Sequence, residues 1–327
     1  MNILVTGGAG YIGSVTVELL RESGHAVIVL DNLSRGFQPA VDKSIPFYEG
    51  NISDSELVGR IIDDHQIEAC VHFAAFAYVG ESVDDPSIYY NNNVAAGISF
   101  LDSLVKGGVK KLVFSSTCSA YGEPQYMPLD EKHPQNPKNP YAWSKFFMER
   151  IMEDYDRAYG LKFIALRYFN ASGAIETRGE AHDPESHIIP IILQVALGQR
   201  EKFSIFGDDY ATDDGTCVRD YIHVADLADA HMRALILLNE TEKSDFFNLG
   251  NGTGYSNLQV VEAARKITGH AIPIEMAPRR AGDPSLLIAD ATKALEMLSW
   301  QIKYPDLESI IKSAWAWHQA HPNGWED

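Results

Sequence analysis

A tyrosine and a lysine four residues apart, Tyr141 and Lys145, are the residues of this sequence best suited to moving a proton. At this spacing two side chains lie on one face of a helix, one turn apart, and the preceding Pro140 is compatible with a helix start. A tyrosine with a pKa of about 10 is a poor base at neutral pH. A nearby ammonium group favours the phenolate and lowers that pKa. The pair alone is common by chance, so its surroundings decide whether it is functional.

Hydroxyl side chains follow a strand predicted at residues 111–116. Ser115, Ser116 and Thr117 stand at its carboxyl end, where an α/β sheet builds its ligand sites. A hydroxyl there can hydrogen-bond a substrate oxygen and pass a proton to or from Tyr141. The alternative is that these hydroxyls only cap local backbone. With the tyrosine and the lysine, they indicate acid–base chemistry at a substrate oxygen.

A glycine-rich turn lies directly after the first predicted strand, at residues 2–6. Gly7, Gly10 and Gly13 have the spacing G-x-x-G-x-x-G and open a helix predicted at 12–23. Glycines permit a tight turn and let backbone approach a pyrophosphate, to which the helix N-terminus presents free N–H groups. Turns are often glycine-rich, but the strand–turn–helix context favours a dinucleotide site.

Asp31 ends the second predicted strand, at residues 26–31. A carboxylate at this place accepts hydrogen bonds from a ribose 2′-hydroxyl and repels a 2′-phosphate. The sequence therefore predicts NAD rather than NADP as the cofactor. A turn-forming aspartate before Asn32 is the alternative interpretation.

The first half of the chain must position these residues, and it alternates strand-like with helix-like stretches. After the first strands the alternation runs through residues 54–65, 70–74, 88–106, 111–116, 141–159 and 163–167. Strands that alternate with helices of this length predict a doubly wound α/β fold, a parallel sheet with helices on both faces.

After residue 170 the regularity weakens. A polar stretch at 172–186 is typical of a long loop. Shorter elements follow, as helices near 189–197, 224–238 and 257–269 and strands near 203–205 and 246–249. We expect a dinucleotide-binding domain over residues 1–170 and a smaller α/β substrate domain over 171–327, interleaved with the first.

Composition excludes some classes of function. A net charge of −18 over 327 residues argues against nucleic-acid binding, which needs a basic surface. The spacing of Cys70, Cys118 and Cys217 fits neither a disulfide framework nor a zinc site. No apolar run approaches the ~18 residues of a membrane span, and the N-terminal run reads as a strand rather than a signal peptide. We expect a cytoplasmic protein that binds neither nucleic acid nor membrane.

Longer stretches carry a specific resemblance. They are TGGAGYIGS at the N-terminus, LDNLS at 30–34, HFAAFAYVGES at 72–82, NNNV at 91–94, FSSTCSAYGE at 114–123, NPYAWSK at 139–145, LRYFNASGA at 166–174, GDDYATDDGTCVRDYIHVADLADAH at 207–231 and APRRAGD at 277–283. Over essentially its whole length the chain resembles the UDP-glucose 4-epimerase family, within the extended short-chain dehydrogenases/reductases. The resemblance implies a Rossmann-type NAD-binding domain and a UDP-sugar substrate.

The same resemblance implies a mechanism. Tyr141 removes the sugar 4-hydroxyl proton with Thr117 bridging, while Lys145 holds the nicotinamide ribose and tunes the tyrosine. Hydride passes from C4 to NAD⁺, the 4-keto sugar rotates, and hydride returns to its other face. NAD stays tightly bound and is regenerated in each cycle, so UDP-glucose and UDP-galactose interconvert.

The resemblance also implies two sets of contacts. The cofactor contacts are Gly7, Gly10, Tyr11, Ile12, Gly13, Asp31, Asn32, Asn51, Ile52, Phe73, Ala74, Ala75, Asn92, Ser115, Tyr141, Lys145, Tyr168 and Phe169. The substrate contacts are Thr117, Tyr141, Asn170, His187, Phe206, Arg219, Arg280, Asp283 and Leu287. The arginines suit a diphosphate, because guanidinium forks match phosphate oxygens.

Five positions depart from the family pattern. Thr117 replaces a common serine, Asn51 an adenine-binding aspartate, and Ala77 a lysine near the cofactor ribose. His187 stands where asparagine is frequent. Leu287 aligns with a pocket-limiting residue that is tyrosine in some members, so we expect room for N-acetylated sugars.

Several alternatives stay open. A UDP-pentose 4-epimerase shares most of these motifs. A nucleotide-sugar dehydratase or decarboxylase is less compatible, because Cys118 and Ser119 follow Thr117 where a dehydratase has an Asp–Glu pair. A non-catalytic NAD sensor would not need the intact Thr117, Tyr141 and Lys145, and a dehydrogenase would release reduced cofactor. The resemblance suggests a homodimer built from the helices at 88–106 and 141–159. No metal site is expected.

Overall fold

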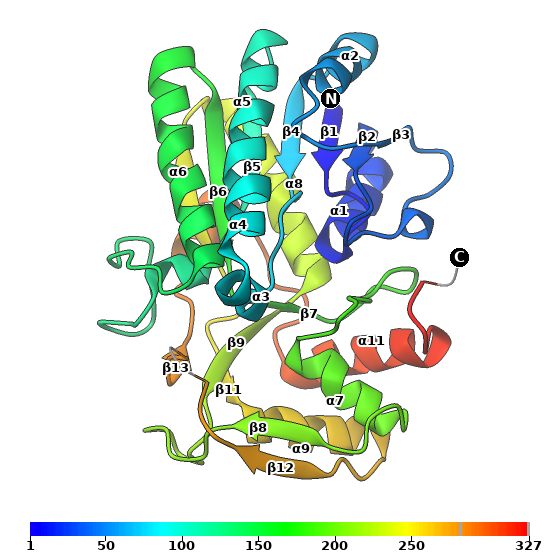
Figure 1. Cartoon of the computed structure of the whole chain (residues 1–327), viewed down its shortest axis with the longest axis vertical. Coiled ribbons are helices and arrows are strands. Elements are labelled where there is room, and N and C mark those ends of the chain that lie inside the picture. The colour runs from blue at the N-terminus through cyan, green and yellow to red at the C-terminus, as the bar shows by residue number, and fades with distance from the viewer. Residues whose placement is uncertain (281–282, 326–327) are drawn as a thin grey trace.

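A seven-stranded parallel sheet forms the upper half of the molecule (Figure 1), in a computed structural model that describes residues 1–280 and 283–325. The strand order is β10-β6-β5-β4-β1-β2-β3. Its strands are β1 Asn2–Thr6, β2 Ala26–Asp31, β3 Phe47–Glu49, β4 Ala69–His72, β5 Lys111–Thr117, β6 Lys162–Tyr168 and β10 Asp245–Leu249. The order reverses direction between β1 and β4, and this is the point where doubly wound sheets bind ligands.

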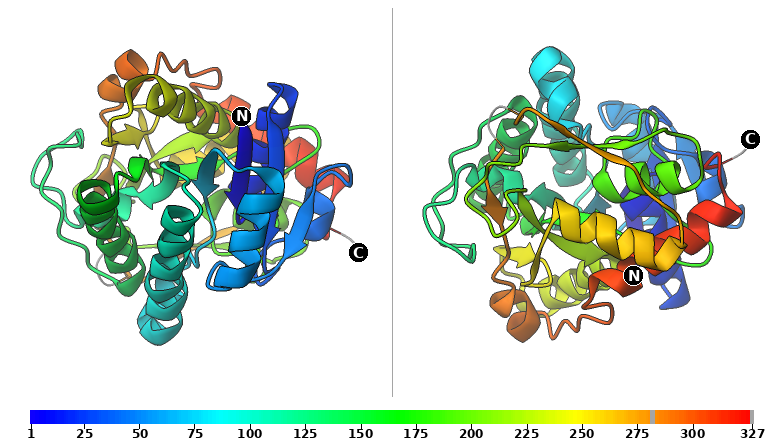
Figure 2. Two further views of the ribbon diagram at one scale, coloured as in Figure 1. Left: turned by 90° about the horizontal axis from the view of Figure 1, so that it is seen from above. Right: turned by 90° about the horizontal axis from the view of Figure 1, so that it is seen from below.

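Helices cover both faces of this sheet (Figures 1 and 2). On one face Ile3 and Val5 of β1 pack with the apolar sides of α1 and α8, and on the other Leu4 packs with those of α2, α5 and α6. The alternation follows from the period of two along a strand. These helices are α1 Tyr11–Glu22, α2 Ser55–His65, α5 Ala96–Lys106, α6 Pro140–Tyr159 and α8 Val224–Thr241.

The lower half is built around a separate core. It contains two small sheets and three helices. The four-stranded sheet consists of β7 Asn170–Ser172, β9 Val218–His223, β11 Gly254–Ser256 and β13 Leu286–Leu287, and the two-stranded sheet of β8 Phe203–Phe206 and β12 Ile274–Ala277. The helices are α7 Ile188–Ala196, α9 Asn257–Thr268 and α11 Leu307–Ala320. Each of these helices contributes a fully buried residue to this core, namely Ile192, Val260 and Ile310. The short α10, Thr292–Met297, packs beside β10.

The predicted fold class is confirmed, and most helix and strand bounds in the first half agree within two residues. One difference is the helix expected at 88–106, which is divided into α4 Pro86–Tyr89, a π-helical turn Tyr90–Ala95 and α5; the short α3, Val79–Asp84, precedes them. Asp54 is the N-cap of α2 rather than part of it, since its carboxylate accepts from the Leu57 backbone N–H.

Two elements that follow residue 170 return to the large sheet. Helix α8 packs on α1, and β10 pairs with β6. The predicted division at residue 170 places α8 and β10 in the smaller substrate domain, which we expected to interleave with the first domain. That division stays a prediction. Strands β3, β7, β9, β11, β12 and β13 were not anticipated. None of the helices described is both long and apolar enough to cross a bilayer.

Candidate active site

A cavity of about 640 Å³ lies at the carboxyl ends of the parallel strands and is lined by residues of both halves of the molecule. Its lining includes all eighteen residues expected to contact the cofactor. It also includes Thr117, Asn170, His187, Arg280 and Asp283 from the expected substrate contacts. The structure therefore brings the residues of the two sets together around a shared space.

The glycine turn at the amino end of α1 has room for backbone only. Gly7 has φ +71°, and a Cβ there would lie 2.6 Å from the Ala74 backbone nitrogen. At Gly13 a Cβ would lie 2.1 Å from the Gly7 carbonyl oxygen. Gly10 is the N-cap residue of α1 and has no side chain that could accept from the N–H groups of the first turn. These N–H groups are therefore left for a ligand. This arrangement fits a dinucleotide pyrophosphate.

Asp31 is fixed where β2 ends, beside that turn. Its carboxylate accepts hydrogen bonds from the backbone N–H groups of Ala9 and Leu33, both at 2.9 Å. Burial raises its pKa, and these two bonds oppose the rise. Because Asp31 also lines the cavity, its free lone pairs can accept from a ribose hydroxyl.

Tyr141 and Lys145 lie on the first two turns of α6, whose start is defined by local capping. Asn139 accepts from the Ala142 backbone N–H at 2.9 Å, and Pro140 occupies the first turn. The Lys145 ammonium donates to the Ser115 carbonyl oxygen at 2.7 Å, and the Thr117 hydroxyl lies close enough to Tyr141 to lower the pKa of that phenol. The end of β5 and the start of α6 thus hold the three side chains at one place in the cavity.

Burial dominates the acid–base properties of this group. It raises the pKa of Tyr141 to about 12, against the lowering effect of the Thr117 hydrogen bond. It lowers the pKa of Lys145 to about 7, although the Glu149 carboxylate opposes the change. In the protein alone burial keeps the Tyr141 pKa high, and the expected lowering by the Lys145 ammonium stays a prediction for the protein with bound NAD.

A buried ion pair behind the site supports both α6 and β5, and the sequence did not reveal it. Arg167 donates to both carboxylate oxygens of Glu149, at 2.9 and 2.7 Å, and neither side chain is more than 3% exposed. Ser116 donates to the same carboxylate at 2.6 Å and Gln135 at 3.0 Å. Glu149 lies one helical turn beyond Lys145. The spacing Y-x-x-x-K-x-x-x-E was the sequence signal that could have pointed to this glutamate.

The remaining expected substrate contacts lie close to the cavity but outside its lining. An Arg219 guanidinium nitrogen is 3.6 Å from the Asp283 carboxylate. The Arg280 guanidinium lies over the Phe206 ring at 4.0 Å. Leu287 pairs with Arg219 in the sheet and packs against the cluster that includes Phe169. Of the APRRAGD stretch, Ala281 and Gly282 lie outside the described residues.

Comparison with known proteins agrees with this site. Residues 3–250 match the model of the NAD dependent epimerase/dehydratase family. The chain is 53% identical to the UDP-glucose 4-epimerase of Lacticaseibacillus casei, over 100% of this chain and 99% of that one. Its fold is similar to that of the UDP-glucose 4-epimerase of Brucella ovis in complex with NAD, with a TM-score of 0.93, 46% identity and coverage of 96% and 97%. It is also similar to the UDP-Glc/GlcNAc 4-epimerase of Campylobacter jejuni, with a TM-score of 0.87, 41% identity and coverage of 98% and 99%.

Proposed function

Because this chain belongs to the NAD-dependent epimerase/dehydratase family, we propose that it is a UDP-glucose 4-epimerase. It interconverts UDP-glucose and UDP-galactose by transient oxidation at C4 of the sugar, with NAD as its cofactor. The observation that carries the proposal is the Tyr141 hydroxyl. It lies beside Thr117 and one helical turn from Lys145, in the cavity that the glycine turn also lines.

The residues that hold NAD are proposed from the shape of the cavity. The turn Gly7–Gly13 takes the pyrophosphate, Asp31 the adenosine ribose, and Lys145 the nicotinamide ribose. Bound there, NAD supplies a hydride acceptor that becomes the donor in the second half of each cycle, and a positive charge beside Tyr141. That charge is needed because burial alone leaves the phenol protonated at neutral pH.

Tyr141 is the proposed base and acid for the sugar 4-hydroxyl. It removes the O4 proton as the C4 hydrogen leaves, and it returns a proton to O4 after the 4-keto group has turned over. Thr117 bridges the phenol and O4. Arg219 and Arg280 hold the diphosphate, so the nucleotide stays bound while the sugar rotates.

Leu287 favours a second candidate substrate, UDP-N-acetylglucosamine. A leucine at this position leaves space beside Phe169 that a tyrosine would fill, and the C. jejuni relative is named for both sugars. UDP-xylose is the pentose alternative. A dehydratase is disfavoured, because Cys118 and Ser119 after Thr117 supply no carboxylate for elimination of water.

The substrate is tested by incubating purified protein, without added NAD, with UDP-galactose, UDP-glucose, UDP-N-acetylglucosamine and UDP-xylose separately. We expect UDP-galactose and UDP-glucose to reach one equilibrium mixture from both directions, with no growth of reduced-nicotinamide absorbance. Turnover of the acetylated pair at a comparable rate would add the second candidate. Turnover of UDP-xylose alone, a dehydrated product, or stoichiometric reduced cofactor would contradict the proposal.

We also propose that residues 1–170 form the NAD-binding domain and residues 171–327 the interleaved nucleotide-sugar domain. A cytoplasmic location is supported by three buried cysteines that are free thiols. A homodimer through α5 and α6 is supported by apolar side chains beside them: Tyr90 is 36% exposed and Phe147 39%, and their rings are 6.2 Å apart.

Light scattering tests the dimer. We expect twice the chain mass of 36.3 kDa, and we expect Phe147→Asp to give monomers, because a carboxylate cannot be buried unpaired in an apolar interface. Leu295→Asp is the matched control, since Leu295 is 40% exposed on the distant α10. A monomeric wild type, or equal effects of the two substitutions, would exclude this interface.

A further inference from the structure

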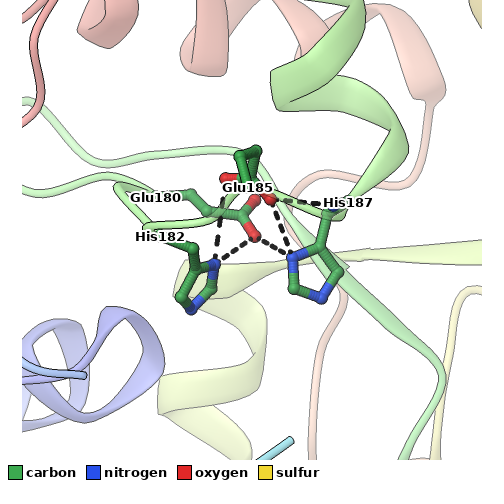
Figure 3. Close-up of side chains that lie close together, drawn as sticks. All are labelled: Glu180, His182, Glu185 and His187. Carbon is green, nitrogen blue, oxygen red and sulfur yellow. Dashed lines mark hydrogen bonds and ion pairs between the residues drawn. The ribbon is translucent and has the colours of Figure 1, made fainter. Parts of the chain in front are cut away.

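Four side chains from the loop between β7 and α7 converge on one point (Figure 3). They are Glu180, His182, Glu185 and His187, and one potential ligand atom from each lies within 4.8 Å of all the others. None of them is needed for the proton transfer at Tyr141. The spacing E-x-H-x-x-E-x-H at residues 180–187 is a local sequence signal for the cluster.

The distances within the cluster are those of hydrogen-bonded ion pairs, and small shifts of about 0.6 Å or less would bring them to the spacing between ligands of one ion. The Nδ1 atoms of His182 and His187 lie 3.0 and 2.7 Å from the same Glu180 oxygen. The Glu185 carboxylate is 3.2 Å from His187 Nδ1 and 3.9 Å from His182 Nδ1. Around a tetrahedral ion with bonds of about 2.0–2.1 Å, neighbouring ligand atoms stand about 3.3 Å apart.

The two buried carboxylates of the cluster need positive charge beside them, although Glu185 also accepts from the backbone N–H groups of Ser186 and His187 at 2.7 Å. The side chains of Glu180 and Glu185 are only 5% and 3% exposed. Among the residues that the structure describes, their ion-pair partners are these two histidines alone. Two adjacent buried carboxylates are costly unless positive charge balances them. One divalent ion balances both while the two imidazoles stay neutral.

We propose that Glu180, His182, Glu185 and His187 form a binding site for a divalent transition-metal ion of the zinc type. Both histidines bind through Nδ1, and each glutamate supplies a carboxylate oxygen. Two nitrogen and two oxygen ligands favour Zn²⁺ over Mg²⁺ or Ca²⁺, which take oxygen ligands almost exclusively.

The ion has a structural role beside the cavity. His182 contacts Tyr11 and Tyr78 edge-on, with ring centroids 6.1 and 5.8 Å apart, and Tyr11 opens α1 next to the glycine turn. Binding at Nδ1 of His187 places its remaining proton on Nε2, which points away from the cluster in Figure 3. His187 lines the cavity, so that N–H is a donor for an anionic ligand.

The competing state is a network of ion pairs without metal. Although burial opposes it, the Glu180 carboxylate raises the pKa of His187 to about 10. A protonated His187 would then hold the two glutamates together. The metal-free network and the metal-bound cluster differ in whether a proton or a metal ion occupies Nδ1 of His187. Measurement of bound metal distinguishes the two states.

The test uses the full chain without an affinity tag, dialysed against a chelator and then titrated with ZnSO₄ and no UDP-sugar. After gel filtration we expect about one Zn²⁺ per chain by mass spectrometry. We expect His182→Gln and Glu185→Gln each to weaken binding by about 100-fold or more, beyond what loss of an outer-shell partner causes. His270→Gln, an exposed histidine outside the cluster, should bind like the wild type.

Cobalt gives a second readout, since Co²⁺ at a four-coordinate site of this kind absorbs visible light and Zn²⁺ should displace it. Circular dichroism and bound NAD show that each variant is folded. The proposal is overturned by wild-type affinity weaker than about 1 mM, or by folded His182→Gln and Glu185→Gln variants that bind as tightly as the His270→Gln control. Neither result depends on epimerase activity, so failure here and failure of the proposed function are distinguishable.

Discussion

Replacing Tyr141 with phenylalanine is expected to lower kcat for UDP-galactose by about 10³-fold. The substitution removes one oxygen atom from a half-buried side chain beside Thr117. Among the described residues, its neighbours Thr117 and Lys145 are poor replacements as the base that takes the O4 proton. Thr117 cannot ionise at neutral pH, and Lys145 is committed to the Ser115 carbonyl at 2.7 Å. Initial rates with saturating UDP-galactose give the measurement.

The control for this variant is Tyr159→Phe, the same change at the far end of α6, where the ring is 52% exposed. It should turn over like the wild type. Bound NAD and far-ultraviolet circular dichroism should be unchanged in both variants, because the ring itself stays in place. A Tyr141→Phe protein that is folded, loaded with cofactor and fully active would move the proton transfer to another residue.

The second large effect is on stability. Arg167→Met should lower the free energy of unfolding by up to about 3–5 kcal/mol, because it leaves the buried Glu149 carboxylate with only the half-exposed Arg150 guanidinium, 3.7 Å away, as a charge partner. Glu149 is 0% exposed, and its hydrogen bonds with Arg167 hold its pKa below the usual range against the effect of burial. Urea denaturation followed by fluorescence measures the change.

Two further variants separate the lost pair from the lost side chain. Arg167→Met combined with Glu149→Leu should recover much of the stability, because an apolar pair of similar volume removes the uncompensated charge. Arg157→Met breaks an ion pair with Asp154 whose side chains are 72% and 68% exposed, and its effect should be small. Equal losses in the Arg167→Met and Arg157→Met variants would show that burial of the pair is unimportant.

The large sheet could be predicted because its signals are local. Strands β1, β2, β5 and β6 are apolar runs between turn residues, and the helices between them have clear apolar faces. The lower half has no such regularity. Strand β9 gains its partners from β7, β11 and β13, which lie far from it in sequence, so short strands there have no local signature.

The site shows the same division. Gly7, Gly13 and Asp31 follow from the spacing of glycines and the end of a strand, whereas the UDP-sugar contacts came only from resemblance. The tyrosine pKa could not be predicted because it depends on how completely the ring is buried. The Glu149–Arg167 pair joins a helix to a strand, and neither residue is unusual in its own segment.

The place of β10 in the sheet has a consequence for how the chain is made. This strand covers the outer edge of β6, but the ribosome delivers it only after β7, α7, β8, β9 and α8 have been synthesised. Until then the nascent chain carries a β6 with one edge unpaired, and this strand includes apolar residues such as Phe163 and Ile164. An open edge of that kind recruits other strands, so molecular chaperones have most reason to engage this protein during the interval between translation of β6 and of β10.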